Sequence, residues 1–408
     1  MPLPNVTVTA AFTLLNSDNG IILDDPVRGV MDSTYVLGGD LPTNISDFVE
    51  AVNVRRGRSG VLETISAGTA TLTLEDQSRT FDSLNTASPY AGNIAPGKRV
   101  TVAVDGVTIF DGKASTWQND YRANAGASVA LALEDALAAL GRRTLNSHTA
   151  TAQLPGARIN AVLDRAEIAF GANRAIDPGA SSLQADAVNA DANALGYLQL
   201  VAGSDNGRLF AARDGVLTFK DRASVASTAA VVTFTDDGSG VDFESVRRSD
   251  AARSLYNRVT VQRAGGVAQT VSAAASIDTF DVRTLSVSGV LLSSDGDALA
   301  MANYLLGLFS APEQRIEAVT VNVTTLPTAE LRTAVVGLDM AQIVRFVWTP
   351  LGMGAPIDRY CIVESIEHAI GPFGHAMTVG LSEVTSRTPF TLDDAVLGVL
   401  DGPGVLIY

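Results

Sequence analysis

A period-two alternation of apolar and polar side chains constrains this chain more than any other feature. In the stretch GTATLTLEDQ, the three threonines of residues 69–73 alternate with an alanine and two leucines. Such alternation places one set of side chains on each face of a pleated strand, so it predicts a half-buried β-strand. The same pattern returns in FVEAVNVRRG, IEAVTVNV and MAQIVRFVW. The sequence therefore predicts a mainly β fold.

Turn signals between these runs favour antiparallel pairing. The segment APGKRVTVAVDGVTIFDGKASTW divides runs of β-forming residues with three dipeptides, Pro96-Gly97, Asp105-Gly106 and Asp111-Gly112. Asp-Gly favours the positive φ angles that tight hairpins need. We interpret the segment as a meander with a turn at each dipeptide.

Three segments have helical periodicity instead. PGARINAVLDRAEI has an apolar helical face that extends to Ala166, and DANALGYLQLVAGS predicts a helix with Asp191 as its N-cap. A third helix is expected to begin at Ser294 or Asp295 and to end near Phe309. Helices of this kind indicate α+β insertions within a mainly β chain.

These patterns divide the chain into five parts. An arm lies at each end of the chain, and each half of the chain contains one mostly β segment. The expected boundaries are an N-terminal arm at 1–47, a first antiparallel barrel or sandwich at 48–142, an α+β insertion at 143–222, a second mostly β half at 223–390 containing the helix 295–309, and a C-terminal arm at 391–408.

Composition excludes several classes of protein. A net charge of −15 and a pI near 4.6 argue against proteins that grip nucleic-acid phosphates, because such binding needs clustered Lys and Arg. Cys361 is the single cysteine, so no intrachain disulfide is possible, and we expect it to be a small buried side chain. The start of the chain lacks a basic signal-peptide region. The sequence has no run of 18 apolar residues, so no membrane span is expected. We expect a soluble protein made in a cytoplasm, without stable membrane insertion.

A search for catalytic or metal-binding patterns finds little. In HAIGPFGH, His368 and His375 stand seven residues apart across a turn that could place them on neighbouring strands. A metal would need a further ligand, for which Glu364 and Glu367 are near in sequence. The sequence contains neither a nucleophile elbow, nor a paired-histidine zinc motif, nor a phosphate-binding loop. We therefore expect a non-enzyme without a cofactor, a catalytic residue or a metal site.

One short peptide occurs near both ends of the chain. Over fifteen aligned positions, residues 23–37 and 392–406 share nine identical residues. Extended apolar peptides that include a glycine are suited to docking on another protein surface, so we interpret both copies as partner-docking segments. The alternative is that each copy packs on its own β segment. The candidate docking residues are Leu23, Asp24, Asp25, Val27, Gly29, Val30, Leu392, Asp393, Asp394, Val396, Gly398 and Val399.

Several stretches resemble one family of proteins. SLYNRVTVQRAGG, SDGDALAMANYLLGLFSAPEQRIEAVTVNV and DRYCIVESIEHAIGPFGHAMTVGLSE are similar to the tail-hub, or minor tail, proteins of tailed bacteriophages. The ending LDDAVLGVLD resembles C-termini of minor tail proteins from siphophages of actinobacterial hosts, which are GC-rich. The family is related to baseplate hub proteins. The resemblance implies two tube-like antiparallel β-barrels per chain, with six barrels in a ring of three chains.

The resemblance also implies a function and partners. The chain would be a structural virion protein, a homotrimeric hub at the tail tip that connects the tail tube to the tip and leaves a channel for DNA ejection. Its implied partners are the distal tail protein ring, the tape measure protein and other tail-tip proteins, and double-stranded DNA would pass only as non-specific cargo. Two alternatives remain open, a tail-associated enzyme and a receptor-binding tip adhesin that act on the host envelope.

Overall fold

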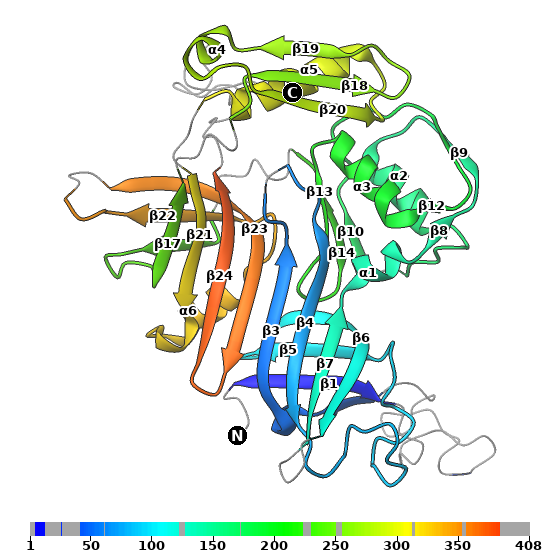
Figure 1. Cartoon of the computed structure of the whole chain (residues 1–408), viewed down its shortest axis with the longest axis vertical. Coiled ribbons are helices and arrows are strands. Elements are labelled where there is room, and N and C mark those ends of the chain that lie inside the picture. Colours follow the sequence, from blue (N-terminus) through cyan, green and yellow to red (C-terminus); the bar gives the residue numbers. More distant parts are fainter. Residues whose placement is uncertain are drawn as a thin grey trace.

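The computed structural model of the chain describes residues 5–12, 26, 41–60, 62–121, 127–171, 173–222, 230–249, 255–311, 315–352 and 356–383. Strands predominate over helices, so the prediction of a mainly β fold is confirmed. Fourteen strands belong to one sheet, and smaller sheets accompany the helices (Figure 1). The fold is best understood through two five-stranded units within the large sheet.

The first β unit is fully antiparallel, with the strand order β3-β4-β7-β6-β5. Its strands form because every second side chain is apolar. In β4, Ala70, Leu72 and Leu74 are buried, whereas the threonines between them are exposed or half-buried. The strands of this unit are β3 (Val49–Gly57), β4 (Ser66–Glu75), β5 (Arg99–Val104), β6 (Val107–Tyr121) and β7 (Ala127–Glu134).

The second β unit repeats this plan, with the order β17-β21-β24-β23-β22. In both units the first, second, fifth, fourth and third strands along the chain lie side by side in that order, and every neighbouring pair is antiparallel. The chain therefore contains one β topology twice. The strands of the second unit are β17 (Ser245–Ser249), β21 (Arg315–Asn322), β22 (Ile343–Trp348), β23 (Ile357–Gly371) and β24 (Gly374–Glu383).

The long strand of each unit contains a β-bulge at an equivalent place. β6 and β23 both have 15 residues. Ser115 is the extra residue where β6 pairs with β7, and Glu364 is the extra residue where β23 pairs with β24. Because a bulge inserts one residue and increases the local twist, Ser115 and Glu364 mark equivalent positions in the two units.

Short strands extend each unit beyond its third strand. β1 (Val6–Phe12) pairs with β5 and with β2 (Leu41–Asn44), and both fall within residues 1–47, the expected arm. β15 (Val232–Thr235) pairs with β22 and with β16 (Val241–Asp242). A 3-10 turn, η1 (Ser46–Phe48), leads from β2 into β3. The described strand pairs leave both units open, so they do not by themselves form closed barrels.

An α+β insertion follows the first β unit and has its own apolar core. Its strands form small separate sheets, and α2 and α3 pack against one another. Its elements are α1 (Ala136–Gly141), β8 (Thr144–Leu145), β9 (His148–Ala150), α2 (Pro155–Leu163), β10 (Arg174–Ile176), β11 (Asp186–Val188), β12 (Ala192–Asn193), α3 (Ala194–Ser204), β13 (Arg208–Ala211) and β14 (Leu217–Lys220).

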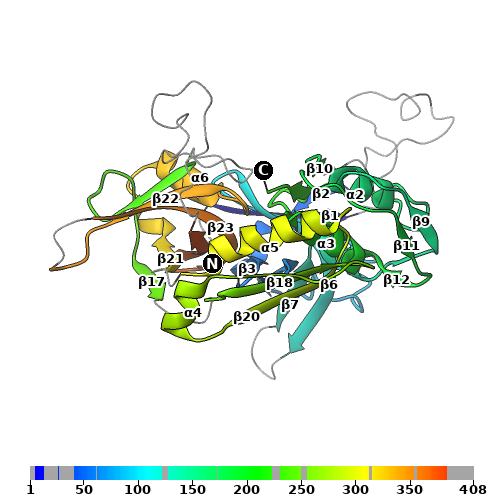
Figure 2. The same ribbon diagram turned by 90° about the horizontal axis from the view of Figure 1, so that it is seen from above.

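A second insertion interrupts the second β unit between β17 and β21. Its three-stranded sheet has the order β19-β18-β20, and α5 runs along this sheet (Figure 2). Ala298, Met301 and Ala302 of α5 share one apolar core with Val259 and Val261 of β18. Its elements are β18 (Arg258–Arg263), β19 (Gln269–Ser272), α4 (Ala274–Phe280), β20 (Thr284–Val290) and α5 (Asp295–Phe309). After β21, η4 (Val323–Thr325) and α6 (Ala329–Val336) lead back to β22. The second insertion lies at one end of the molecule, beyond both β units (Figure 1).

One predicted turn is wrong. Asp105 and Gly106 have φ values of 48° and 80° and do form the tight turn between β5 and β6. Asp111 and Gly112 instead lie inside β6. A Cβ atom on Gly112 would come within 2.5 Å of the Glu134 carbonyl oxygen, so this glycine permits close strand contact rather than a turn.

Two predicted helix ends also differ. α2 ends at Leu163, so Ala166 is outside it. α3 is capped by Asn193, whose side chain accepts a hydrogen bond from the Gly196 N–H, and not by Asp191. Asp191 has a φ of 63° and belongs to the preceding turn. Both errors concern the first or last turn, where sequence signals are weakest.

Candidate functional site

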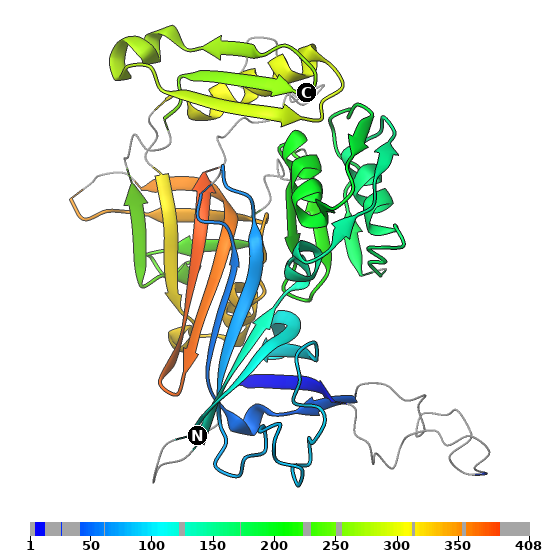
Figure 3. The same cartoon turned by 45° about the vertical axis from the view of Figure 1, so that its right-hand side comes forward.

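The two β units meet at one strand pair, which we call the unit junction. The second half of β23 pairs antiparallel with β3, from Ser365 opposite Gly57 to Ile370 opposite Val52. The two strands lie side by side in Figures 1 and 3. This pair makes the two units one continuous sheet.

A buried carboxylate, Glu364, sits at the bulge beside this junction. Its side chain accepts hydrogen bonds from Arg58 Nε at 2.8 Å, Arg208 Nη2 at 2.8 Å and Ser382 Oγ at 2.6 Å. Burial alone raises the pKa of the Glu364 carboxyl, but the charges of Arg208 and Arg58 outweigh burial and lower the pKa to about 2. Glu364 is therefore a fixed negative charge between two arginines.

The arginines of this cluster come from different parts of the fold. Arg58 directly follows β3 of the first β unit, and Arg208 begins β13 of the α+β insertion. Nearby, Asp339 bonds Arg56 Nη1 at 2.6 Å and the backbone N–H of Arg213 at 2.8 Å. These two clusters tie the first unit, the second unit and the α+β insertion together.

The backbone is unusually close at Gly57. This residue has a φ of 106°, and a Cβ atom there would come within 2.2 Å of the Glu364 carbonyl oxygen. Only glycine suits both conditions, because L side chains avoid this φ and no space exists for one. Gly57 therefore allows β3 to reach the bulge of β23.

Two histidines pair next to the junction. His368 on β23 and His375 on β24 are both buried, and their Nδ1 and Nε2 atoms lie 2.9 Å apart. The prediction that these histidines stand on neighbouring strands is confirmed. Burial lowers the pKa of His368 well below its usual value, and the neighbouring His375 and Arg56 add to this. Burial lowers the pKa of His375 to about 4, so the pair is neutral at pH 7.

This pair is expected to make stability fall on acidification. Because both folded pKa values lie below the unfolded value of about 6.5, the unfolded chain binds more protons, and stability falls as pH falls below about 6.5. The part due to His375 is lost between about pH 6.5 and 4. For His375 alone the loss is about 3 kcal/mol. Urea unfolding at pH 7, 6, 5 and 4 measures it. A His375→Gln variant should have a smaller pH slope, and an unchanged slope would contradict the assignment.

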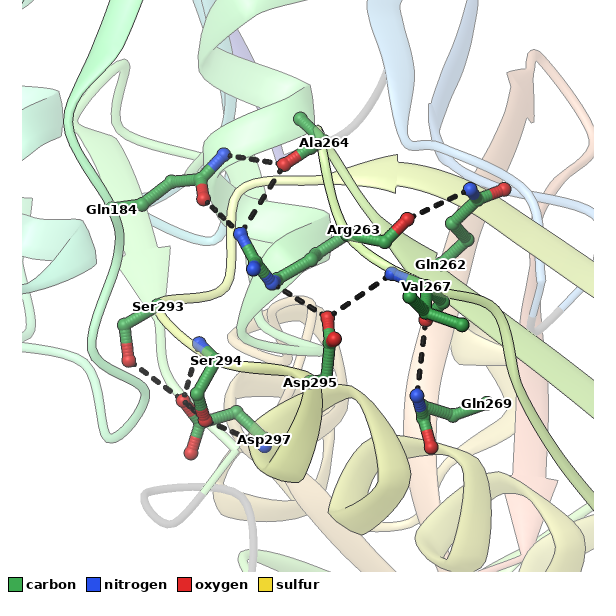
Figure 4. A network of polar contacts seen from close by, with 11 residues as sticks. Gln184, Gln262, Arg263, Ala264, Val267, Gln269, Ser293, Ser294, Asp295 and Asp297 are labelled. Atoms are coloured by element: carbon green, nitrogen blue, oxygen red, sulfur yellow. Dashed lines mark hydrogen bonds and ion pairs between the residues drawn. The ribbon is translucent and has the colours of Figure 1, made fainter.

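A second joint links the two insertions. Gln184 donates to the Ala264 carbonyl at 2.9 Å and accepts from Arg263 Nη1 at 2.8 Å, while Arg263 Nε donates to Asp295 at 2.7 Å (Figure 4). Ser294 and Asp297 form a capping box at the start of α5. The second insertion is thereby held against the α+β insertion at the end of β18, and Asp295 of α5 fixes the Arg263 side chain that makes this contact.

The other residues singled out from sequence have these positions. Cys361 is buried in β23, as predicted, and burial raises its thiol pKa to about 12. Glu364 and Glu367 bind arginines, and no group of three His, Cys, Asp or Glu side chains in the described part of the chain could hold a metal. The twelve candidate docking residues of the repeated peptide all lie outside the described residues. No helix among the described segments has the length and apolar character needed to cross a membrane.

The junction clusters were missed by sequence reasoning. Glu364 is 306 residues from Arg58 and 156 residues from Arg208 along the chain, and nothing in the local pattern connects them. The one available signal was a glutamate that directly follows the apolar residues Cys361, Ile362 and Val363. A charged residue in such a run needs a buried partner.

Comparisons with known proteins identify the fold. No protein-family model matches the chain, and no curated protein matches it. Among solved structures, a 43 kDa tail protein of prophage MuSo2 from Shewanella oneidensis aligns with a TM-score of 0.60 and 13% identity, over 92% of this chain and 97% of that one. A tail protein from Neisseria meningitidis MC58 aligns with a TM-score of 0.61 and 12% identity, over 93% and 96%. The chain has the fold of phage tail proteins.

Proposed function

We propose that the chain is a structural virion protein, a homotrimeric hub at the distal end of a phage tail. The observation that carries the proposal is a fold shared over nearly the whole length with two tail proteins, neither of which is described as an enzyme. In this proposal the hub connects the tail tube to the tip. The two β units serve as its tube-like barrels.

The repeated β topology supports a ring. A chain with two equivalent units presents two equivalent surfaces, so three chains present six. Such an arrangement suits contact with a six-fold tail tube and with a three-fold tip. The partners we propose are the distal tail protein ring, the tape measure protein and other tail-tip proteins. The repeated terminal peptide would supply six docking segments.

The charge of the chain suits a passage for DNA. At a net charge of −15, the surface repels phosphates rather than holding them. Double-stranded DNA would then pass through the centre of the ring as non-specific cargo. The second insertion and the α+β insertion lie at the other end of the molecule from β1 and β2, where they would extend the ring along the tail axis (Figure 1).

Native mass spectrometry of the purified protein tests the proposal. We expect a main species of three chains at micromolar concentration, and a tail-tube or distal-ring partner should add to it without displacing a chain. A species that stays monomeric, alone and with tail partners, would contradict the hub. Specific hydrolysis of host-envelope polymers, lost on a point mutation, would favour the enzyme alternative.

A further inference from the structure

The unit junction uses two strand edges whose equivalents have no strand beside them in the described chain. At the junction, residues 365–370 of β23 pair with β3. The equivalent of β23 in the first β unit is β6. There β5 covers one edge as far as Lys113, and residues 116–121 of that edge pair with no described strand. The equivalent of β3 in the second β unit is β17, which pairs with β21 alone among the described strands.

We propose that residues 116–121 of β6 in one copy pair antiparallel with β17 of a second copy. The joint that β23 and β3 make within the chain is thus repeated between chains. The proposal rests on the proposed function, because it supplies the contact that joins neighbouring copies of the ring. The interface uses two different surfaces, so it propagates in one direction and closes when the rotation between copies permits.

The register of this joint follows from the equivalent bulges. The residue after each bulge is Thr116 in β6 and Ser365 in β23, so residue 120 corresponds to Ala369. Within the junction, Ala369 lies opposite Asn53. In the proposed joint, β6 therefore places Asp120 where β23 places Ala369 in the unit junction.

The second strand is aligned in the same way. In the first unit, Asn53 of β3 lies opposite Thr71 of β4, and Thr71 lies opposite Ala132 of β7. Ala132 in turn faces Thr116, the first residue after the bulge of β6. In the second unit, Arg247 lies opposite Ala318, and Ala318 opposite Gly380, which faces Ser365. Arg247 is therefore the equivalent of Asn53. The register places Asp120 of one copy opposite Arg247 of the next.

The side chains at these positions are complementary. Asp120 is exposed and makes no ion pair with the described residues. The Arg247 side chain is 71% exposed; its Nε lies 3.4 Å from Glu317 of the same copy, and this exposed pair leaves the rest of the guanidinium for the Asp120 carboxylate. Side chains of opposite charge that face each other across two neighbouring strands stabilise the pairing. The junction within the chain has a similar pair, Arg55 and Glu367, at 3.2 Å.

The next position in the register is apolar. Tyr121 is 53% exposed although its hydroxyl donates to Asp82 at 2.5 Å, and Val246 packs half-buried on the apolar core. Their equivalents, Ile370 and Val52, are both buried within the chain. Contact between Tyr121 and Val246 would cover an aromatic ring that one copy leaves in water. An uncovered long strand edge is otherwise prone to non-specific pairing.

Disulfide cross-linking between copies tests the register. In the full-length protein, Asp120→Cys combined with Arg247→Cys puts one new thiol on each edge. Opposed residues in an antiparallel pair have Cα atoms about 4.5–5.5 Å apart, which a disulfide can bridge. After mild oxidation we expect covalent species of three chains on a denaturing gel, and each single variant should stay at one chain.

A register-shifted variant is the matched control. Asp120→Cys with Ser245→Cys places the thiols two positions apart on the same face, so cross-linking should fall at least about fivefold. Equal cross-linking in both double variants would contradict the register.

Charge exchange gives a second, independent readout. Asp120→Arg or Arg247→Asp alone should weaken self-association about tenfold or more, and the double exchange should restore most of it. If native mass spectrometry gives three chains but cross-linking and charge exchange have no effect, the joint is wrong and the hub stands. If neither a trimer nor cross-links form, both proposals fall.

Discussion

Replacing Glu364 with alanine is expected to lower the free energy of unfolding by about 3–5 kcal/mol. The change leaves Arg58 and Arg208, each 11% exposed, as buried charges without their shared carboxylate. Removing one member of a buried ion pair costs more than the pair itself contributes, because the remaining charge stays desolvated. Urea unfolding followed by circular dichroism measures the loss.

A neighbouring exposed pair provides the control. Glu367→Ala removes a carboxylate whose side chain is 49% exposed and whose partner Arg55 is 67% exposed. Exposed pairs contribute at most about 1 kcal/mol, so this variant should remain close to the parent protein. Equal losses in the two variants would show that the buried cluster has no special role.

Acid gives a further test of Glu364. Its folded pKa of about 2 lies below the unfolded value of about 4.3. The stabilisation is therefore present above pH 4.3 and is lost as pH falls toward 2. This window begins near pH 4.3, where that of His375, from pH 6.5 to 4, is nearly complete, so the loss due to Glu364 should follow the loss due to His375.

Gly57→Ala is expected to destabilise the protein by at least about 3 kcal/mol, or to prevent folding. The added methyl group would collide with the backbone of Glu364 and Ser365, and alanine disfavours a φ of 106°. β3 would have to move away from β23, which opens the unit junction. Thermal unfolding and the yield of folded protein measure the effect.

Gly92→Ala separates the two causes. Gly92 also has a positive φ, 78°, but a Cβ atom there meets nothing within 4 Å. Its replacement should cost only the backbone preference, about 1–2 kcal/mol. If both variants lose the same stability, close contact at the junction is not what Gly57 provides.

Local patterns predicted the strands well where one face is buried. The alternation of residues 69–74 became β4, and the Asp105-Gly106 dipeptide became the turn between β5 and β6. Helix α5 begins after its N-cap Ser294 and ends at Phe309, as expected, because a capping side chain and an apolar helical face both depend on residues close in sequence. Such features depend on neighbours within a few positions.

Features set by distant contacts were not predictable in this way. Gly112 follows an aspartate and so suggested a turn, but its contact with Glu134 keeps it inside a strand. The two β units share one strand order, but their amino-acid sequences show no similarity from which this could be predicted. Glu364 and its arginines likewise meet only after three parts of the fold assemble.

The central claim is that the two β units of one chain occupy equivalent positions in a ring of three chains. Electron cryo-microscopy of the purified assembly tests it most directly. We expect a three-fold particle in which six β units surround a channel and β6 of each copy runs beside β17 of the next. A monomer, a two-fold dimer, or a three-fold particle whose β units lie at unlike radii would contradict the claim.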